Sequence, residues 1–181
     1  MSNHNLTHIT VTPDAIGLTD EVKGLYLESF PEEERRPWES ICGLIESGAP
    51  FFKFVIVRSD AGIAGFYTLW RFPQALYVEH FAVMRSLRGN GFGSEILTEI
   101  KTQAGELPVV VEVEPAESSS EAVSRIKFYE KAGFTALYDF QYVQPPYAKG
   151  LPEVPMMLMT TSPLPDIELF VIQLHTLVYN K

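Results

Sequence analysis

Residues 81–94 read FAVMRSLRGNGFGS and mark the junction between an apolar strand and a helix. We expect the strand to end at Val83 and the helix to begin near Gly91. The first backbone N–H groups of a helix have no partner within it and lie at the positive end of its dipole. Glycines at positions 89, 91 and 93 remove side chains that would block a bulky anion. This stretch therefore predicts a phosphate-binding loop at a helix N-terminus.

Two common nucleotide-binding motifs do not fit this loop. A dinucleotide-binding G-x-G-x-x-G that began at Gly91 would need glycine where Ile96 stands. The nucleoside-triphosphate loop needs Gly-Lys-Ser or Gly-Lys-Thr at its end, which these residues lack. Arg85 and Arg88 add positive charge nearby. The loop thus suits a diphosphate, and the alternative is a glycine-rich turn that only joins the strand to the helix.

Apolar segments on both sides of the loop are typical of one mixed domain. Short connections between neighbouring strands predict antiparallel hairpins, whereas the helix that follows residues 75–83 predicts a parallel pairing of that strand with 109–113. We expect strands at 9–11, 51–57, 63–71, 75–83, 109–113, 134–143 and 154–160, and helices at 19–30, 37–48, 94–104, 121–132 and 166–179. This order predicts one three-layer α/β (α+β) domain over residues 1–181.

Composition narrows the class of protein. The chain has 181 residues and is 46% hydrophobic, which suits one domain with a sizeable core. A formal net charge of -9 argues against nonspecific binding to nucleic acid or anionic membranes. The lone Cys42, the lack of a signal-peptide pattern and the lack of a long apolar run lead us to expect a cytoplasmic location. The sequence has no cluster of cysteine and histidine residues that would predict a metal site.

A second motif lies at residues 125–134, which read RIKFYEKAGF. With the apolar-Ala-Val step at 81–83 and Arg-Gly-x-Gly-x-Gly at 88–93, it resembles the GNAT superfamily of acetyl-CoA-dependent N-acetyltransferases. The resemblance covers about residues 6–160, and the closing helix at 166–179 lies beyond it. It implies helices on both faces of a mixed, mostly antiparallel sheet in which one pair of parallel strands splays apart.

The resemblance also implies where acetyl-CoA binds. Backbone groups of Phe81, Ala82 and Val83 would pair with the pantetheine arm. The pyrophosphate would be held by amides of Arg88, Gly89, Asn90, Gly91, Phe92, Gly93 and Ser94. Where many relatives have an asparagine that contacts CoA, this chain has serines, so Ser118 or Ser119 is a weak substitute. Arg125 could reach a phosphate or form an ion pair with a carboxylate.

The chemistry of amine acetylation suggests two catalytic candidates. Glu79 is our candidate general base, acting through water, and the alternative is a structural carboxylate or one that only orients the amine. Strand alternation places Glu79 on the face of Phe81, with His80 on the opposite face. By the resemblance, the Tyr129 hydroxyl would protonate the departing sulfur; the alternative is core packing against Phe128 and Phe134.

The acceptor side is poorly specified. The acidic run at 32–34 would favour a cationic amine, although a solvated loop explains it as well. Aromatic side chains that line an acceptor pocket, or only pack, are Trp38, Trp70, Tyr142 and Tyr147. We therefore expect direct transfer from acetyl-CoA to a primary amine of a small molecule or protein, by a monomer or homodimer without nucleic-acid or membrane partners. The rivals are a non-catalytic acyl-CoA sensor and a chain that keeps the fold without the cofactor.

Overall fold

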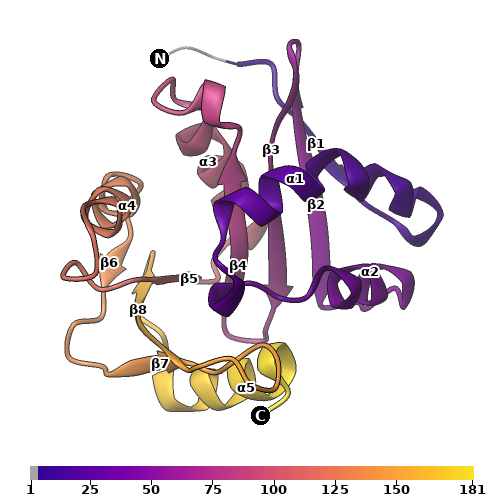
Figure 1. Cartoon of the computed structure of the whole chain (residues 1–181). Helices are drawn as coiled ribbons and strands as arrows, with labels where there is room; N and C mark the ends of the chain where they lie inside the picture. The colour runs from indigo at the N-terminus through magenta and orange to yellow at the C-terminus, as the bar shows by residue number, and fades with distance from the viewer. Residues whose placement is uncertain (1–3) are drawn as a thin grey trace.

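One mixed sheet organises residues 4–181, the part of the chain that the computed structural model describes (Figure 1). Within these residues the sheet has eight strands in the order β1-β2-β3-β4-β5-β8-β6, and β7 pairs with β8. The strands are β1 (Thr7–Thr10), β2 (Phe52–Ser59), β3 (Gly62–Arg71), β4 (Leu76–Val83), β5 (Val109–Val113), β6 (Thr135–Ala136), β7 (Tyr142–Gln144) and β8 (Val154–Thr160). The β4–β5 pair is parallel and the other pairs are antiparallel, which confirms the predicted mixed sheet.

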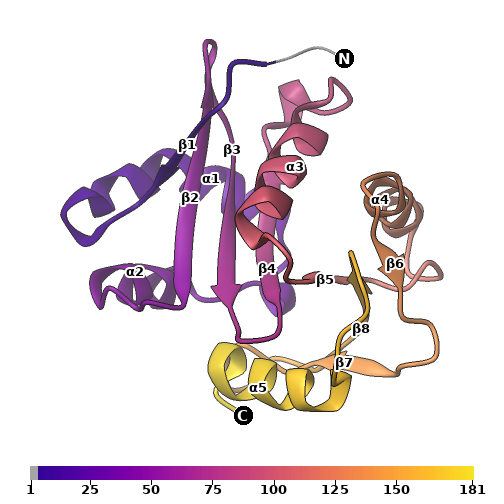
Figure 2. The same ribbon diagram turned by 180° about the vertical axis from the view of Figure 1, so that it is seen from behind.

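Helices cover both faces of the sheet, which confirms the predicted three layers (Figures 1 and 2). The helices are α1 (Asp20–Ser29), α2 (Trp38–Glu46), α3 (Phe92–Ala104), α4 (Ser120–Lys131) and α5 (Ile167–Tyr179). Short 3-10 turns occupy Pro13–Thr19, Glu32–Glu34 and Arg85–Leu87. Helices α1, α2 and α5 share one core with the sheet, and α3 and α4 share the other.

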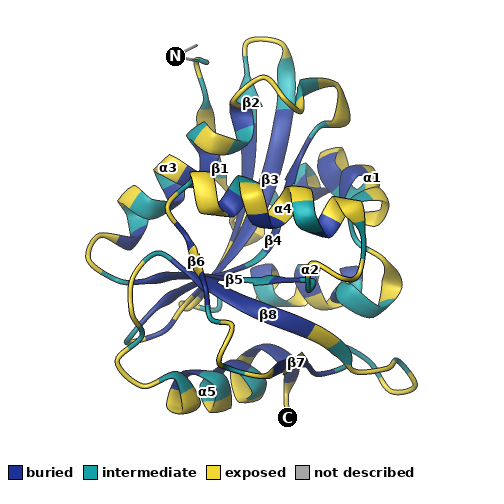
Figure 3. Ribbon diagram, turned by 90° about the vertical axis from the view of Figure 1, so that its left-hand side faces the viewer, coloured by how far each residue is buried: buried dark blue, intermediate teal, exposed yellow. Residues whose placement is uncertain are grey.

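Local signals explain where several helices begin and end. The Asp166 side chain accepts a hydrogen bond from the Leu169 amide at 2.9 Å and caps α5. The Ser119 hydroxyl accepts one from the Ala122 amide at 3.0 Å and caps α4 in the same way. Each helix turns an apolar stripe to the sheet and an exposed stripe to solvent (Figure 3).

The parallel pair separates after a short contact. Strands β4 and β5 pair only through residues 76–78 and 109–111, after which β4 runs on to Val83 and β5 to Val113 without pairing to each other. One edge of β4 therefore keeps backbone N–H and C=O groups without a strand partner. The predicted splay is thus confirmed, and it opens the sheet next to the glycine loop.

One predicted strand, at residues 134–143, is wrong. The structure divides it into β6 and β7, which both pair with β8. Between them the Phe140 amide donates to the Leu137 carbonyl at 3.1 Å and closes a turn. Tyr138 lies in this turn and is 72% exposed. Because Tyr138 and Asp139 lie in this turn, the apolar residues around them belong to two short strands.

Candidate active site

A cavity of about 830 Å³ opens where β4 and β5 splay apart. Its volume lies within the range of ordinary ligand pockets. It extends from the glycine loop and α4 to the C-terminal end of α1 and the segment after β7. The lining residues that matter below are Glu79, Phe81, Ala82, Val83, Arg88, Gly89, Gly91, Gly93, Ser94, Glu112, Tyr129 and Tyr147. The splay thus brings the two sequence motifs to one cavity.

The glycine loop forms the phosphate-sized end of this cavity. Gly89 and Gly91 have φ of +78° and +93°, a backbone region that residues with a Cβ rarely adopt. The Ser94 amide donates to the Gly91 carbonyl at 3.0 Å, and the Arg88 amide donates to the Arg85 carbonyl at 3.4 Å. Within residues 4–181, the amides of 89–93 have no such acceptor. The central amides of the predicted 88–94 run can therefore meet an anion, whereas those at its two ends are already bonded.

The predicted pantetheine strand, residues 81–83, lies along the cavity. Its one edge pairs with β3, so the opposite edge faces the splay. The Phe81 ring stacks on Phe128 of α4 at a centroid distance of 6.2 Å. The Arg88 guanidinium donates through Nε to the Val83 carbonyl at 3.0 Å, which fixes the start of the loop to the end of β4.

Tyr129 lies on α4 and lines the same cavity. Its ring packs against Phe128 and Phe134, with centroid distances of 5.3 and 5.2 Å. Burial raises the pKa of the Tyr129 phenol to about 12, so the hydroxyl carries its proton at neutral pH. Packing and proton donation are therefore compatible here, since the ring is held by core contacts while the residue borders the cavity.

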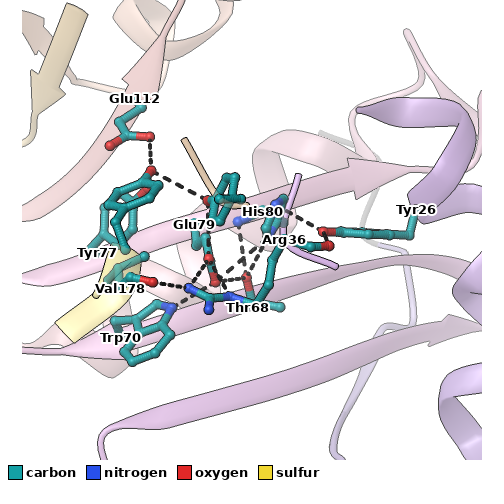
Figure 4. A network of polar contacts seen from close by, with 11 residues as sticks. Tyr26, Arg36, Thr68, Trp70, Tyr77, Glu79, His80, Glu112 and Val178 are labelled. Atoms are coloured by element: carbon teal, nitrogen blue, oxygen red, sulfur yellow. Dashed lines mark hydrogen bonds and ion pairs between the residues drawn. The ribbon is translucent and has the colours of Figure 1, made fainter. Parts of the chain in front are cut away.

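Glu79 is held as a carboxylate by a dense set of donors (Figure 4). Its side chain is 0% exposed, and Arg36 approaches Oε1 with Nη2 at 2.8 Å and Nε at 2.9 Å. The Trp70 indole N–H donates to Oε2 at 2.7 Å, and the Tyr147 hydroxyl donates to Oε1 at 3.1 Å. Although burial opposes ionisation, the nearby Arg36 and these donors hold the pKa of Glu79 well below its ordinary value. These contacts favour the orienting role over the role of general base.

A β-bulge changes which face Glu79 occupies. Leu69 pairs with Val78 and Thr68 pairs with His80, so Glu79 is the extra residue of β4. The Thr68 hydroxyl lies 3.5 Å from Glu79 Oε2 and 3.3 Å from His80 Nδ1. Strict alternation was therefore wrong for this pair, because the bulge turns both side chains to the same face. Phe81 remains on the other face, against Phe128 of α4.

His80 is packed into the core. It is 1% exposed, and its Nε2 lies 3.3 Å from the hydroxyl of Tyr26. The rings of Tyr26 and Phe30 stand edge-on to it at centroid distances of 5.0 and 4.9 Å. These contacts favour the interpretation of His80 as a hydrogen-bonded core histidine.

Glu112 is a second cavity carboxyl that the sequence analysis did not single out. It lies on β5, just beyond the last residue that pairs with β4. The Tyr179 hydroxyl donates to its Oε2 at 2.7 Å, and the Tyr142 hydroxyl donates to its Oε1. Because Tyr142 and Tyr179 come from β7 and α5, only the folded chain brings them to Glu112. An acidic residue within a buried valine-rich strand was the one signal available in the sequence.

Two weaker candidates have structural roles. The Ser119 hydroxyl is used as the cap of α4. Arg125 forms an ion pair with Glu114, which favours the second of the two readings given for it. In residues 4–181, no helix is long and apolar enough to cross a membrane, and no group of three metal-ligating side chains gathers.

Trp38 and Trp70 are both buried. Trp38 packs with Tyr26 in the core, whereas Trp70 reaches the Glu79 carboxylate.

Glu34, from the acidic run at 32–34, lines the cavity, and burial raises the pKa of its carboxyl from the ordinary value. One member of the acidic run thus borders the site.

Comparison with known proteins identifies the family. Residues 50–136 match the model of the acetyltransferase (GNAT) domain. The chain is 34% identical to a solved structure described as "Putative acetyltransferase from GNAT family from Bacteroides thetaiotaomicron", with a TM-score of 0.87. That alignment covers 97% of this chain and 99% of the other.

More distant matches share the fold or part of the sequence. An acetyltransferase of Bacillus subtilis solved in complex with CoA shares the fold, with a TM-score of 0.58, 18% identity and coverage of 90% of this chain and 100% of that one. The "Putative acetyltransferase YjbC" of Bacillus subtilis is 24% identical over 108 residues, which are 59% of this chain and 53% of that protein, so the match spans about half of its length. The sequence resemblance is thereby confirmed, and the chain belongs to the GNAT family of acetyltransferases.

Proposed function

We propose that the protein transfers an acetyl group from acetyl-CoA directly to a primary amine of a small molecule or protein. One observation carries this proposal: a single cavity joins the glycine loop, the open edge of β4, Tyr129 and two buried carboxyl groups. The glycine loop suits a diphosphate, and the open edge of β4 suits the extended pantetheine arm. Tyr129 suits the departing thiolate, and the carboxyl groups suit an amine. The solved Bacillus subtilis acetyltransferase with CoA is a distant relative that supports the choice of donor.

The chain's own groups fit acetyl-CoA at each end. The amides of 89–93 and the positive end of α3 would hold the pyrophosphate. The open edge of residues 81–83 would hydrogen-bond the pantetheine amides as a neighbouring strand does. Direct transfer needs no covalent enzyme intermediate, and the sole cysteine, Cys42, is outside the cavity lining.

Tyr129 would supply the proton for the leaving thiolate. Since its phenol is protonated at neutral pH, it can donate as the C–S bond breaks. Glu79 and Arg36 would fix the shape of the acceptor side through their buried ion pair. We place the reaction in the cytoplasm, where acetyl-CoA is formed and used.

Two measurements test the proposal. Calorimetry with acetyl-CoA should show one site per chain, and release of free thiol should depend on an added amine from a panel of polyamines, aminoglycosides, amino acids and lysine peptides. The variant Gly91→Val is the control for binding, because a branched side chain at φ +93° distorts the loop. Binding without acetylation of any amine would leave an acyl-CoA sensor as the function, and absence of binding would refute the donor itself.

A further inference from the structure

The buried carboxyl of Glu112 is the cavity group that the proposed function leaves without a role. It lies on β5 opposite Glu79 of β4, at the point where the two strands part (Figure 4). The hydroxyls of Tyr142 and Tyr179 hold its two oxygens, and the Tyr77 hydroxyl of β4 lies 3.4 Å from that of Tyr179. Since a carboxylate offers about four lone-pair sites, at least one stays free for a ligand in the cavity.

The electrostatic surroundings of Glu112 and Glu79 are opposite. Glu79 has Arg36 at 2.8 Å, whereas no Lys, Arg or His of residues 4–181 forms an ion pair with Glu112. Two arginines with acidic partners elsewhere are Arg36, bound to Glu79, and Arg125, bound to Glu114. A carboxylate at position 112 is therefore stabilised by neutral donors alone.

The groups that face Glu112 come from three elements, the loop after β7 and the turn before α2. Strand β4 contributes Tyr77 and Glu79, β7 contributes Tyr142, and α5 contributes Tyr179. Tyr147, from the loop, donates to Glu79 and lies 3.4 Å from the Tyr179 hydroxyl. From the turn before α2, Glu34 adds a further negative charge. Burial, opposed by the three tyrosine hydroxyls, raises the pKa of Glu112 to about 7.

We propose that Glu112 is the general base of the reaction and accepts the proton of the acceptor ammonium group. This inference rests on the proposed N-acetyltransfer. Two carboxyl groups whose surroundings drive their acidities apart are a recurrent arrangement in acid–base catalysis. Glu79 is too weak a base for the task at neutral pH, whereas Glu112 gains and loses a proton near the working pH.

The proton and electron balance is complete with the groups present. The Glu112 carboxylate takes one proton from R–NH₃⁺, and the freed lone pair forms the N–C bond at the thioester carbon. The C–S bond then breaks, the sulfur takes the Tyr129 proton, and the Tyr129 phenolate takes the second proton from nitrogen. The products are the amide and free CoA thiol, and Glu112 returns its proton to solvent.

The test is the pH dependence of a ratio of rates. We compare kcat/KM of the wild type with that of Glu112→Gln, because glutamine keeps the shape of the protonated acid and cannot accept a proton. At about pH 7 the ratio should be about 10²–10⁴, the usual contribution of a general base. Above about pH 7 it should fall about tenfold for each pH unit, because the variant depends on the free amine, which grows more abundant as pH rises, whereas the wild type uses the ammonium form. Below about pH 7 the ratio should stay level, because protonation of Glu112 slows the wild type as much as loss of the free amine slows the variant.

Two further variants separate this role from structure. Glu46→Gln removes the same charge from the exposed end of α2 and should give a ratio near one at every pH. Tyr179→Phe removes a donor that favours the ionised form of Glu112, so the acid limb of the wild-type profile should move to higher pH while acetyl-CoA still binds. A ratio for Glu112→Gln that is constant with pH, or an acid limb unmoved in Tyr179→Phe, would overturn the role.

A readout without turnover completes the test. A carboxyl whose pKa is raised on folding stabilises the native state relatively less as pH rises, from the ordinary value to the raised one. Glu112→Gln should therefore gain unfolding free energy over the wild type between about pH 4.5 and 7 and stay level above, in urea titrations. If the difference in unfolding free energy between Glu112→Gln and the wild type does not change with pH, the role of Glu112 is overturned and the proposed acetyl transfer is not affected. A wild type that titrates as expected and acetylates no amine overturns the proposed function, and with it the catalytic role.

Discussion

Replacement of Arg36 by methionine is the sharpest test of how the acceptor side is built. Arg36 is 6% exposed, and its Nη2 also donates to the Val178 carbonyl at 2.5 Å. Trp70 and Tyr147 flank it, with ring centroids 5.2 and 5.3 Å away. Methionine keeps much of the buried volume and removes the charge, so the substitution removes the ion pair with Glu79 together with the bond to Val178.

We expect Arg36→Met to lose much of its unfolding free energy, because the buried charge of Glu79 would be left without its partner. Removal of one member of a buried ion pair costs about 3–5 kcal/mol. With a urea m-value of about 2 kcal/mol per M, the midpoint of unfolding should fall by about 1.5–2.5 M. The double variant Arg36→Met/Glu79→Gln should recover much of this loss, because it leaves no carboxylate to desolvate.

The pH dependence has a definite sign. Since the pKa of Glu79 is lowered on folding, its stabilisation is complete above the ordinary value and is lost as pH falls toward the lowered one. Without Arg36, burial raises the pKa of Glu79, so the carboxyl binds a proton at mildly acidic pH. The loss of unfolding free energy in Arg36→Met, relative to the wild type, should therefore be greatest near neutral pH and become smaller in acid.

The measurement is urea unfolding of the wild type, the two single variants Arg36→Met and Glu79→Gln, and the double variant. Experiments at about pH 7 and about pH 4.5 give both the loss of stability and its pH dependence. Circular dichroism and tryptophan fluorescence should give coincident transitions before the free energies are compared. A loss below about 1 kcal/mol for Arg36→Met, or a double variant no more stable than the single one, would refute the reasoning. Either result would mean that Glu79 is solvated or neutral in the native state.

Three other variants test separate parts of the fold and site. Tyr129→Phe should lower kcat by about 10²-fold while calorimetry gives an unchanged Kd for acetyl-CoA; a change in Kd alone would favour packing. Gly91→Ala should cost about 1 kcal/mol in thermal unfolding and weaken acetyl-CoA several-fold, because its φ of +93° strains any residue with a Cβ; unchanged binding would argue against the loop as a phosphate site. Asp166→Ala should cost about 1 kcal/mol through loss of the cap of α5, whereas Asp166→Asn should cost little.

Local signals in the sequence predicted most of the elements. Val109–Val113 and Val154–Thr160 were placed without error, because each is a continuous apolar run. The helix between β4 and β5 sufficed to predict their parallel pairing. The glycine loop could be found because its chemistry depends on consecutive backbone amides, which the sequence displays directly.

The acceptor side could not be predicted from local signals, because its residues are distant in sequence. Arg36 bonds the carbonyl of Val178, which is 142 residues away, and Tyr179 bonds Glu112 across 67 residues. No spacing rule connects such pairs. The bulge at Glu79 is also invisible to alternation, since it depends on how β3 and β4 pair around Thr68.

The last turn of α5 therefore has a place in the site as well as in the core. Its Val178 carbonyl holds the cation that keeps Glu79 ionised, while the hydroxyl of the next residue, Tyr179, holds Glu112. Consecutive residues thus set the charge states of two carboxyl groups on neighbouring strands. A shift of this turn would weaken both sets of contacts together, raising the pKa of each carboxyl. Helix α5 lies outside the matched region 50–136, and the roles that we propose for Glu79 and Glu112 depend on these contacts of its last turn.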